Sequence, residues 1–194
     1  MAQLRMKCTN LIEAPVDLKS GYSIVDSLTK EYSTDELSKA WGKICEELNG
    51  KYDEERYKTV MLADQRIPEG AIYFVRDNEG QLISTSAMIV TEETGVAVLH
   101  MVGTRTDAKG KGAGAAVTAY CVNEAIKRNI SQMWLKTDDF RIPAIKIYYR
   151  LGFLPWLFEE GMRERWTIVA KNLGWELLKV LNEKGEEEII KIAG

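Results

Sequence analysis

The sequence contains few of the residues on which disulfide frameworks and metal sites depend. Among its 194 residues are one histidine, His100, and three cysteines, Cys8, Cys45 and Cys121. The cysteines are odd in number and widely separated, which indicates reduced thiols in a reducing compartment. Their spacing resembles no metal site. We therefore predict a protein that binds no metal.

The sequence also lacks long apolar runs and an excess of positive charge. No stretch is long and apolar enough to span a bilayer, and the first residues lack the apolar segment of a signal peptide. The formal net charge is -3 at pH 7, whereas a general nucleic-acid binder would be basic. We therefore predict a cytoplasmic protein that binds neither membranes nor nucleic acid.

Internal repeats, low-complexity tracts and flexible linkers are absent as well. A chain of this length, 45% hydrophobic and 28% charged, can bury one substantial core. We predict a single domain over residues 1–194. Residues 1–20 look irregular, and they and residues 175–194 are candidates for peripheral extensions.

The pattern of apolar residues changes along the chain from helical spacing to strand alternation. Ser33 or Thr34 with Glu36 is a capping signal, and it begins the first of two helical segments. Strong turn signals separate the next three strands, which predicts an antiparallel meander. A helix and a further strand follow, which predicts a right-handed crossover between parallel strands. The predicted helices cover 33–48, 54–65, 115–128, 142–151 and 161–173; the strands cover 21–27, 71–76, 81–90, 96–103 and 132–137; residues 175–192 form a hairpin or a helix.

A glycine-rich loop, Lys109–Gly114, joins the 96–103 strand to the following helix. Such a junction directs unpaired backbone N–H groups and the positive end of a helix dipole toward one point. Glycines let an anion approach the backbone closely, because no Cβ stands in the way. Two lysines add positive charge. The loop therefore predicts a phosphate or pyrophosphate site.

Two common phosphate-binding motifs fit this loop poorly. In a P-loop whose first glycine is Gly103, the second glycine would fall at position 108 and the Ser or Thr at position 110. These positions hold Ala108 and Gly110, so the motif is not present. A dinucleotide-binding motif matches formally at Gly110, Gly112 and Ala115. However, its first glycine should close the strand, and here six residues intervene after an antiparallel meander. A nucleotide-binding domain stays the weaker alternative.

A third motif fits better and extends beyond the loop. Lys109-x-x-Gly112-x-Gly114 resembles the Arg/Gln-x-x-Gly-x-Gly/Ala signature of the GNAT acetyltransferases, which bind the pyrophosphate of coenzyme A. Ala144–Phe153 matches in full the family pattern Ala-x-x-x-Tyr-x-x-x-Gly-Phe. The two motifs occur in the family's order and cover about residues 96–153. Lys109 replaces the usual Arg or Gln, and Arg141 stands where many members have Asn.

This resemblance implies an α+β fold, in which helices flank a mixed, mostly antiparallel twisted sheet of about six to seven strands. A central parallel pair of strands, 96–103 and 132–137, would splay around the cofactor, acetyl-CoA. Backbone groups near Val102 and Thr104 would bind the pantetheine arm. The pyrophosphate would be bound by residues of the loop and the start of the helix: Lys109, Gly110, Lys111, Gly112, Ala113, Gly114 and Ala115.

The resemblance also suggests two catalytic side chains. Tyr148 occupies the position of a general acid for the leaving thiolate, since a phenol has an ordinary pKa near ~10. A buried aromatic residue with a satisfied hydroxyl is the structural alternative. His100 resembles the histidines that serve amine deprotonation in arylalkylamine acetyltransferases. Strict alternation places it on one face with Val98, Val102 and Thr104, where a hydrogen-bonded core histidine is the alternative.

The function predicted from these motifs is acetyl transfer from acetyl-CoA to a primary amine, by direct attack in a ternary complex. The acceptor would be a small molecule or a peptide, and the enzyme a monomer or a homodimer. A non-catalytic acyl-CoA-binding module, acting as a sensor, would have the same loop and is the alternative from a different functional class.

Overall fold

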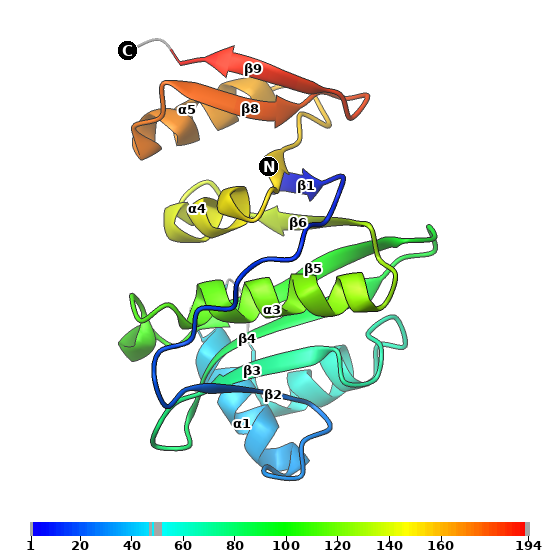
Figure 1. Ribbon diagram of the computed structural model, residues 1–194, viewed down its shortest axis with the longest axis vertical. Coiled ribbons are helices and arrows are strands. Elements are labelled where there is room, and N and C mark those ends of the chain that lie inside the picture. Colours follow the sequence, from blue (N-terminus) through cyan, green and yellow to red (C-terminus); the bar gives the residue numbers. More distant parts are fainter. Residues whose placement is uncertain (1, 47, 49–51, 193–194) are drawn as a thin grey trace. The chain divides into compact units, whose positions relative to one another are not determined.

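The computed structural model describes residues 2–46, 48 and 52–192 (Figure 1). Contacts divide the chain into two compact units. The contiguous unit is Glu13–Ile130, and the split unit combines Met1–Ile12 with Ser131–Gly194.

The contiguous unit contains the predicted meander and the glycine loop. In chain order its elements are β2 Ser23–Asp26, α1 Thr34–Cys45, α2 Glu54–Arg56, the π-helical turn η1 Tyr57–Leu62, β3 Ile72–Arg76, β4 Leu82–Val90, β5 Val96–Thr104, the 3-10 turn η2 Thr106–Ala108 and α3 Ala113–Lys127. Strands β2, β3, β4 and β5 pair in that order, and each neighbouring pair is antiparallel. The predicted meander and the helix that follows the glycine loop are therefore confirmed.

The first helix begins where its capping signal predicts. The Ser33 side chain accepts from the Glu36 N–H, and the Glu36 side chain accepts from the Ser33 N–H, so both halves of a capping box form. This arrangement satisfies two N–H groups that a helix end otherwise leaves unpaired. The second helical segment also forms, but as one short α-helix followed by a wider π-helical turn.

Strand alternation gives the sheet of the contiguous unit two different faces. On one face, the Ser86 hydroxyl donates to the Val117 carbonyl of α3, and Tyr73 packs edge-on against Tyr120. On the other face, Ala87 belongs to the buried cluster that contains Trp41 of α1. The sheet is thus covered by α3 on one side and by α1 on the other (Figure 1).

The split unit combines the beginning of the chain with its last third. Its elements are β1 Leu4–Cys8, β6 Gln132–Thr137, α4 Ile142–Arg150, β7 Leu154–Pro155, α5 Met162–Leu173, β8 Leu177–Leu181 and β9 Glu187–Lys191. Strand β1 lies between β6 and β7 and is antiparallel to both. Strands β8 and β9 form a separate hairpin.

Two of these strands differ from the sequence predictions. Residues 1–20 were expected to be irregular, yet Leu4–Cys8 forms the middle strand of three, with Leu4, Met6 and Cys8 buried. The two-residue strand Leu154–Pro155 was not predicted either. For residues 175–192, where a hairpin and a helix were both open, the hairpin is confirmed.

Within the described ranges, no helix combines the length and the apolar character needed to cross a membrane.

Candidate active site

The glycine loop has the geometry expected of an anion site. Gly110 and Gly112 have φ values of 77° and 83°, in the left-handed region that favours glycine. Gly112 is the N-cap of α3, and no side chain caps the helix there. The first N–H groups of a helix have no partner within it, so those of α3 are available to an external acceptor. A Cβ added at Gly110 would meet no atom within 4 Å.

The segment just before the loop is fixed by an ion pair between Arg105 and Asp107. Arg105 donates from Nε and one terminal nitrogen to the two oxygens of Asp107, at 2.6 Å each, and from the other terminal nitrogen to Gln81 at 2.8 Å. This ion pair holds the pKa of the Asp107 carboxyl below its usual value, chiefly through the hydrogen bonds from Arg105. Lys109 and Lys111 are exposed, so their charges lie at the surface of the loop.

Gly114 is required by close packing between α3 and the end of β5. A Cβ at Gly114 would lie 2.8 Å from Oγ1 of Thr104. That hydroxyl is itself 2.9 Å from the Ser84 hydroxyl, which donates to the Gly103 carbonyl at 2.7 Å. The third motif glycine therefore sets the distance between the strand that leads into the loop and the helix that leaves it.

We expect Gly114→Ala to lower the free energy of unfolding by about 1–3 kcal/mol, because the added methyl overpacks against Thr104. The double variant Thr104→Ala Gly114→Ala removes the opposing oxygen and should recover most of this loss. Urea unfolding of the two single variants and the double variant measures the coupling. Additive losses would contradict the packing explanation.

Strand β5 carries a bulge just before the loop. His100 pairs with Ala87 and Gly103 pairs with Thr85, so β5 has one more residue than β4 between these pairs. Met101, within the bulge, has a φ of 49°, which is rare for a residue with a side chain. A bulge interrupts the hydrogen-bond ladder and redirects the strand. Val102, predicted to bind pantetheine through its backbone, lies inside it.

The bulge corrects the predicted position of His100. Residues that pair across a ladder direct their side chains to the same face. His100 pairs with Ala87 and therefore faces the α1 side, whereas Thr104 pairs with Ser84 and faces α3. Strict alternation, which put His100 and Thr104 on one face, is wrong here because the extra residue reverses the order.

The charge of His100 acts on one carboxylate, that of Asp64. The pKa of Asp64 is lowered to about 2, first by hydrogen bonds from Arg66 and to a smaller degree by the charge of His100. The Arg66 Nε and Nη2 atoms donate to the two Asp64 oxygens at 2.9 and 2.7 Å. His100 is half-buried, so solvent reaches it.

The second motif forms α4 of the split unit. Tyr148 is buried, with 6% of its surface exposed, and its ring packs edge-on against Phe153. Burial raises the pKa of its phenol to about 12, and the charge of Arg141 opposes this only partly. No described residue forms a hydrogen bond with its hydroxyl. The phenol of Tyr148 is thus neutral, and its O–H group can donate a hydrogen bond to a ligand.

Gly152, Phe153 and Tyr149, the residues near Tyr148 in this motif, have structural roles. Gly152 ends α4 at a φ of 85°, and the Phe153 N–H returns to the Tyr148 carbonyl. The neighbouring Tyr149 instead accepts from the Lys179 N–H at 3.1 Å and stacks on Trp175, with ring centroids 4.6 Å apart. Tyr149 is therefore part of the packing.

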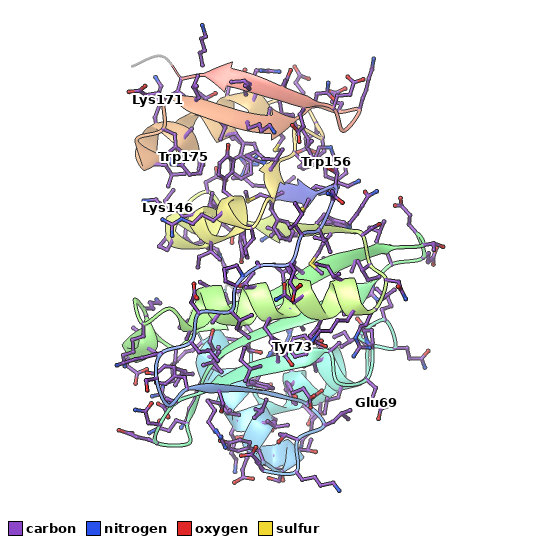
Figure 2. The ribbon with its side chains drawn as sticks, in the orientation of Figure 1. Glu69, Tyr73, Lys146, Trp156, Lys171 and Trp175 are labelled. Atoms are coloured by element: carbon purple, nitrogen blue, oxygen red, sulfur yellow. The ribbon has the colours of Figure 1, made fainter. Side chains whose placement is uncertain are left out.

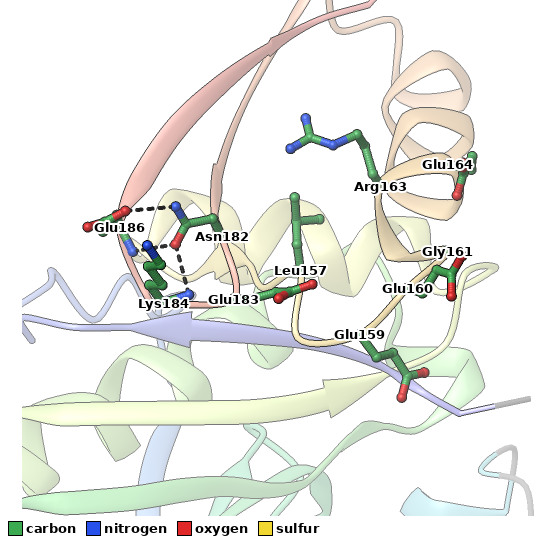
Figure 3. Close-up of a pocket in the computed structure, with 10 residues that line it drawn as sticks. All are labelled: Leu157, Glu159, Glu160, Gly161, Arg163, Glu164, Asn182, Glu183, Lys184 and Glu186. Carbon is green, nitrogen blue, oxygen red and sulfur yellow. Dashed lines mark hydrogen bonds between the residues drawn. The ribbon is translucent and has the colours of Figure 1, made fainter.

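A cavity of about 470 Å³ lies elsewhere in the split unit (Figure 3). Glutamates dominate its lining, and Arg163 and Lys184 are its basic residues. None of the predicted site residues lines it. The acetyltransferase motifs and this cavity are therefore separate features of the chain.

Comparison with known proteins identifies the family to which these motifs belong. A family model described as the acetyltransferase (GNAT) family matches residues 30–153, which include both motifs. The chain belongs to the GNAT acetyltransferase family. This confirms the predicted family and, with the solved structures below, the α+β GNAT fold.

Among curated proteins, the chain is similar to a mycothiol acetyltransferase of Streptomyces bingchenggensis, at 28% identity over 86 residues. The match covers 44% of this chain and 27% of that relative, so the chain spans only about a quarter of its length.

Two solved structures share the fold. A GCN5-related N-acetyltransferase from Kribbella flavida has a TM-score of 0.56 at 20% identity, over 80% of this chain and 55% of its own. The ribosomal-protein-S18-alanine N-acetyltransferase from Escherichia coli has a TM-score of 0.54 at 20% identity, over 68% of this chain and 76% of its own.

Sequence reasoning did not find two features of this site. The bulge at Met101 has no local signal, because methionine is not a residue that favours positive φ. The hydroxyl pair of Ser84 and Thr104, which packs against Gly114, joins residues from two strands. The close packing of Gly114 against Thr104 can be predicted only when the strand register, and so the face on which Thr104 lies, is known.

Proposed function

We propose that the protein is an acetyl-CoA-dependent N-acetyltransferase that transfers the acetyl group to a primary amine by direct attack in a ternary complex. The observation that carries this proposal is the uncapped, glycine-lined start of α3 in a chain of the GNAT family. Three N–H groups at a helix end, with a favourable dipole, suit the pyrophosphate of coenzyme A.

The residues proposed to bind the cofactor lie on the loop and on β5. The backbone of Gly112, Ala113, Gly114 and Ala115 would hold the pyrophosphate, with Lys109, Gly110 and Lys111 at the rim. Backbone groups of Val102 and Thr104 would hold the pantetheine arm, and an N–H there would polarise the thioester carbonyl that acetyl-CoA supplies. The bulge supports this assignment, because a bulged strand leaves backbone groups outside the ladder.

Tyr148 is proposed as the general acid. Its phenol donates a proton, or a hydrogen bond, to the thiolate that leaves. With a pKa of about 12, the phenol is a weaker acid than a thiol of pKa near ~8.5. It is therefore better suited to stabilise the developing thiolate by hydrogen bonding than to transfer the proton completely.

His100 is proposed as the base that accepts the proton of the attacking amine. Its side chain is half-buried on the α1 face of the sheet, the face opposite α3 and the glycine loop. The amine would therefore approach from the α1 side. Asp64 lies close enough to His100 for their charges to interact, so the protonated imidazole that results would be stabilised.

We expect that kcat/KM of His100→Gln no longer falls as the pH is lowered, so that the acid limb of the pH profile is lost. A general base must be neutral, so activity falls as pH decreases through its titration, and a glutamine has no such step. Initial rates at saturating acetyl-CoA, measured from acid to neutral pH, test this. An acid limb identical to that of the parent protein would assign proton removal to another group.

Binding and turnover together test the proposed function. Calorimetry should detect coenzyme A at one site per chain. Release of free thiol from acetyl-CoA should then accelerate with at least one member of an amine panel. The panel should include small amines and peptide N-termini, because the similar proteins include a mycothiol acetyltransferase and a ribosomal-protein alanine N-acetyltransferase. Failure to bind coenzyme A contradicts the proposal, and binding without turnover across the panel favours the non-catalytic sensor.

A further inference from the structure

One face of the three-stranded sheet in the split unit carries alternating cations and aromatic rings. Arg5 and Lys7 of β1 point away from the buried Leu4, Met6 and Cys8. The members of this face, here called the basic face, are Arg5, Lys7, Trp134, Lys136, Trp156 and Phe158. Lys136 is exposed and the other five are half-buried, so solvent reaches the face.

The strand register places these side chains beside one another. Arg5 stands opposite Lys136, and Lys7 stands opposite Trp134. On the other edge of β1, the backbone N–H of Trp156 (labelled in Figure 2) donates to the Arg5 carbonyl at 2.9 Å, which sets Trp156 next to Arg5. Three separate segments of the chain therefore build one surface.

The guanidinium of Arg5 is held by three rings. Its Cζ lies 4.1 Å from the ring centroid of Phe158, 5.6 Å from that of Trp134 and 5.8 Å from that of Trp156. Stacking on a ring occupies the flat face of a guanidinium and leaves its N–H donors directed outward in the plane. Among the described residues, none accepts a hydrogen bond from these donors.

The two acids that follow β6 do not neutralise this face. Asp138 and Asp139 follow β6 directly, but each is paired elsewhere. Asp138 lies 2.8 Å from Arg141, and Asp139 lies 2.5 Å from Arg165. Within the described part of the chain, Arg5, Lys7 and Lys136 have no carboxylate partner. Three positive charges, one of them on the stacked guanidinium of Arg5, thus lack an anion.

We propose that the basic face binds the phosphate group of a ligand, with Arg5 donating two parallel hydrogen bonds to phosphate oxygens. The guanidinium fork matches the spacing of oxygens in phosphate and carboxylate groups. Lys7 and Lys136 flank it, and this excess of charge favours the doubly charged phosphate over a carboxylate. The basic face belongs to the split unit and shares no residue with the glycine loop, so this proposal goes beyond the proposed acetyl transfer.

A position-specific probe can separate this site from the glycine loop, which also suits phosphate. The protein is labelled with 5-fluorotryptophan, and the resonances of Trp134 and Trp156 are assigned by Trp→Phe variants. Inorganic phosphate is then titrated at constant ionic strength, with acetate in a parallel arm. The fully buried Trp41 and Trp166 serve as internal references. We expect saturable shifts of Trp134 and Trp156, with weaker affinity for acetate.

Variants then test which cations hold the phosphate. Arg5→Gln should weaken phosphate binding at least about tenfold, because it removes the charged, two-point donor. Lys136→Gln, at an exposed position that leaves the rings in place, should weaken it about threefold. Lys171→Gln, an exposed lysine of α5 (Figure 2), should have no effect.

Three results would overturn the proposal: unmoved Trp134 and Trp156 resonances, shifts that persist in Arg5→Gln and Lys136→Gln, or tighter binding of acetate than of phosphate. Because the basic face and the glycine loop share no residue, failure here does not affect the proposed acetyl transfer, which calorimetry with coenzyme A tests by itself. A lower melting temperature for Arg5→Gln, with no phosphate binding by the parent protein, would make Arg5 a structural residue only.

Discussion

Tyr148→Phe is expected to lower kcat about hundredfold, while KM for acetyl-CoA changes by less than about twofold. The substitution removes only the phenolic hydroxyl, which has no hydrogen-bond partner among the described residues. The ring and its edge-on contact with Phe153 remain. A group that acts only as the thiolate leaves contributes to kcat and not to binding.

Stability measurements distinguish this role from a structural one. Because no described partner is lost, Tyr148→Phe should unfold at the same temperature as the parent protein. The matched control is Tyr149→Phe, which removes the acceptor of the Lys179 N–H. That variant should lose stability by about 1 kcal/mol and keep its kcat. If Tyr148→Phe keeps the full kcat of the parent protein, Tyr148 is a packing residue and not the general acid.

The raised pKa of Tyr148 also makes a prediction about alkaline pH. A general acid loses activity as pH rises through its pKa, and this phenol has a pKa of about 12. Activity should therefore show no decline caused by this group between about pH 8 and about pH 10, whereas a phenol of ordinary pKa, near ~10, would already be titrating there. A kcat profile from neutral to alkaline pH, compared between the parent and Tyr148→Phe, measures the difference.

Met6→Ala is expected to lower the free energy of unfolding by about 2–5 kcal/mol. Met6 has no exposed surface and stands between Leu135 of β6 and Pro155 of β7. Removing most of its side chain leaves a cavity in the middle of the three-stranded sheet. Urea unfolding measures the loss, and Thr9→Ala, at an exposed position just after the strand, is the control.

Hydrogen exchange locates the effect of Met6→Ala. Amides of β6 and β7 should exchange faster in the variant, because both strands are hydrogen-bonded to β1. Amides of the β3–β5 meander belong to the contiguous unit and should be less affected. A stability equal to that of the parent protein would show that the sheet does not depend on this side chain.

The sequence predicted well those elements that are specified by short motifs of neighbouring residues. The capping box at Ser33, the turn at 77–80 and the glycine loop each depend on residues close together in the chain. Strand β1 was missed although Leu4–Cys8 alternates between buried and half-buried residues. Its partners begin at Gln132, and nothing local indicates a pairing over such a separation.

The same limit applies to the candidate site. The glycines at 110 and 112 were recognised from local conformational rules, and their positive φ values agree with them. The face of His100 was predicted wrongly, because a single bulged residue reverses every later position in the strand. Register between strands, which no short motif encodes, decides where these side chains lie.

The pairing of β1 has a consequence for the order in which the chain folds as it is synthesised. The contiguous unit is complete once residue 130 has emerged, and its contacts are local to that segment. Leu4, in contrast, pairs with Thr137, and Met6 with Pro155, so these contacts close loops of well over a hundred residues. Such closure is slow and entropically unfavourable. The newly made β1 must therefore stay unpaired during synthesis of the meander and α3, exposing an apolar strand edge that a chaperone can recognise.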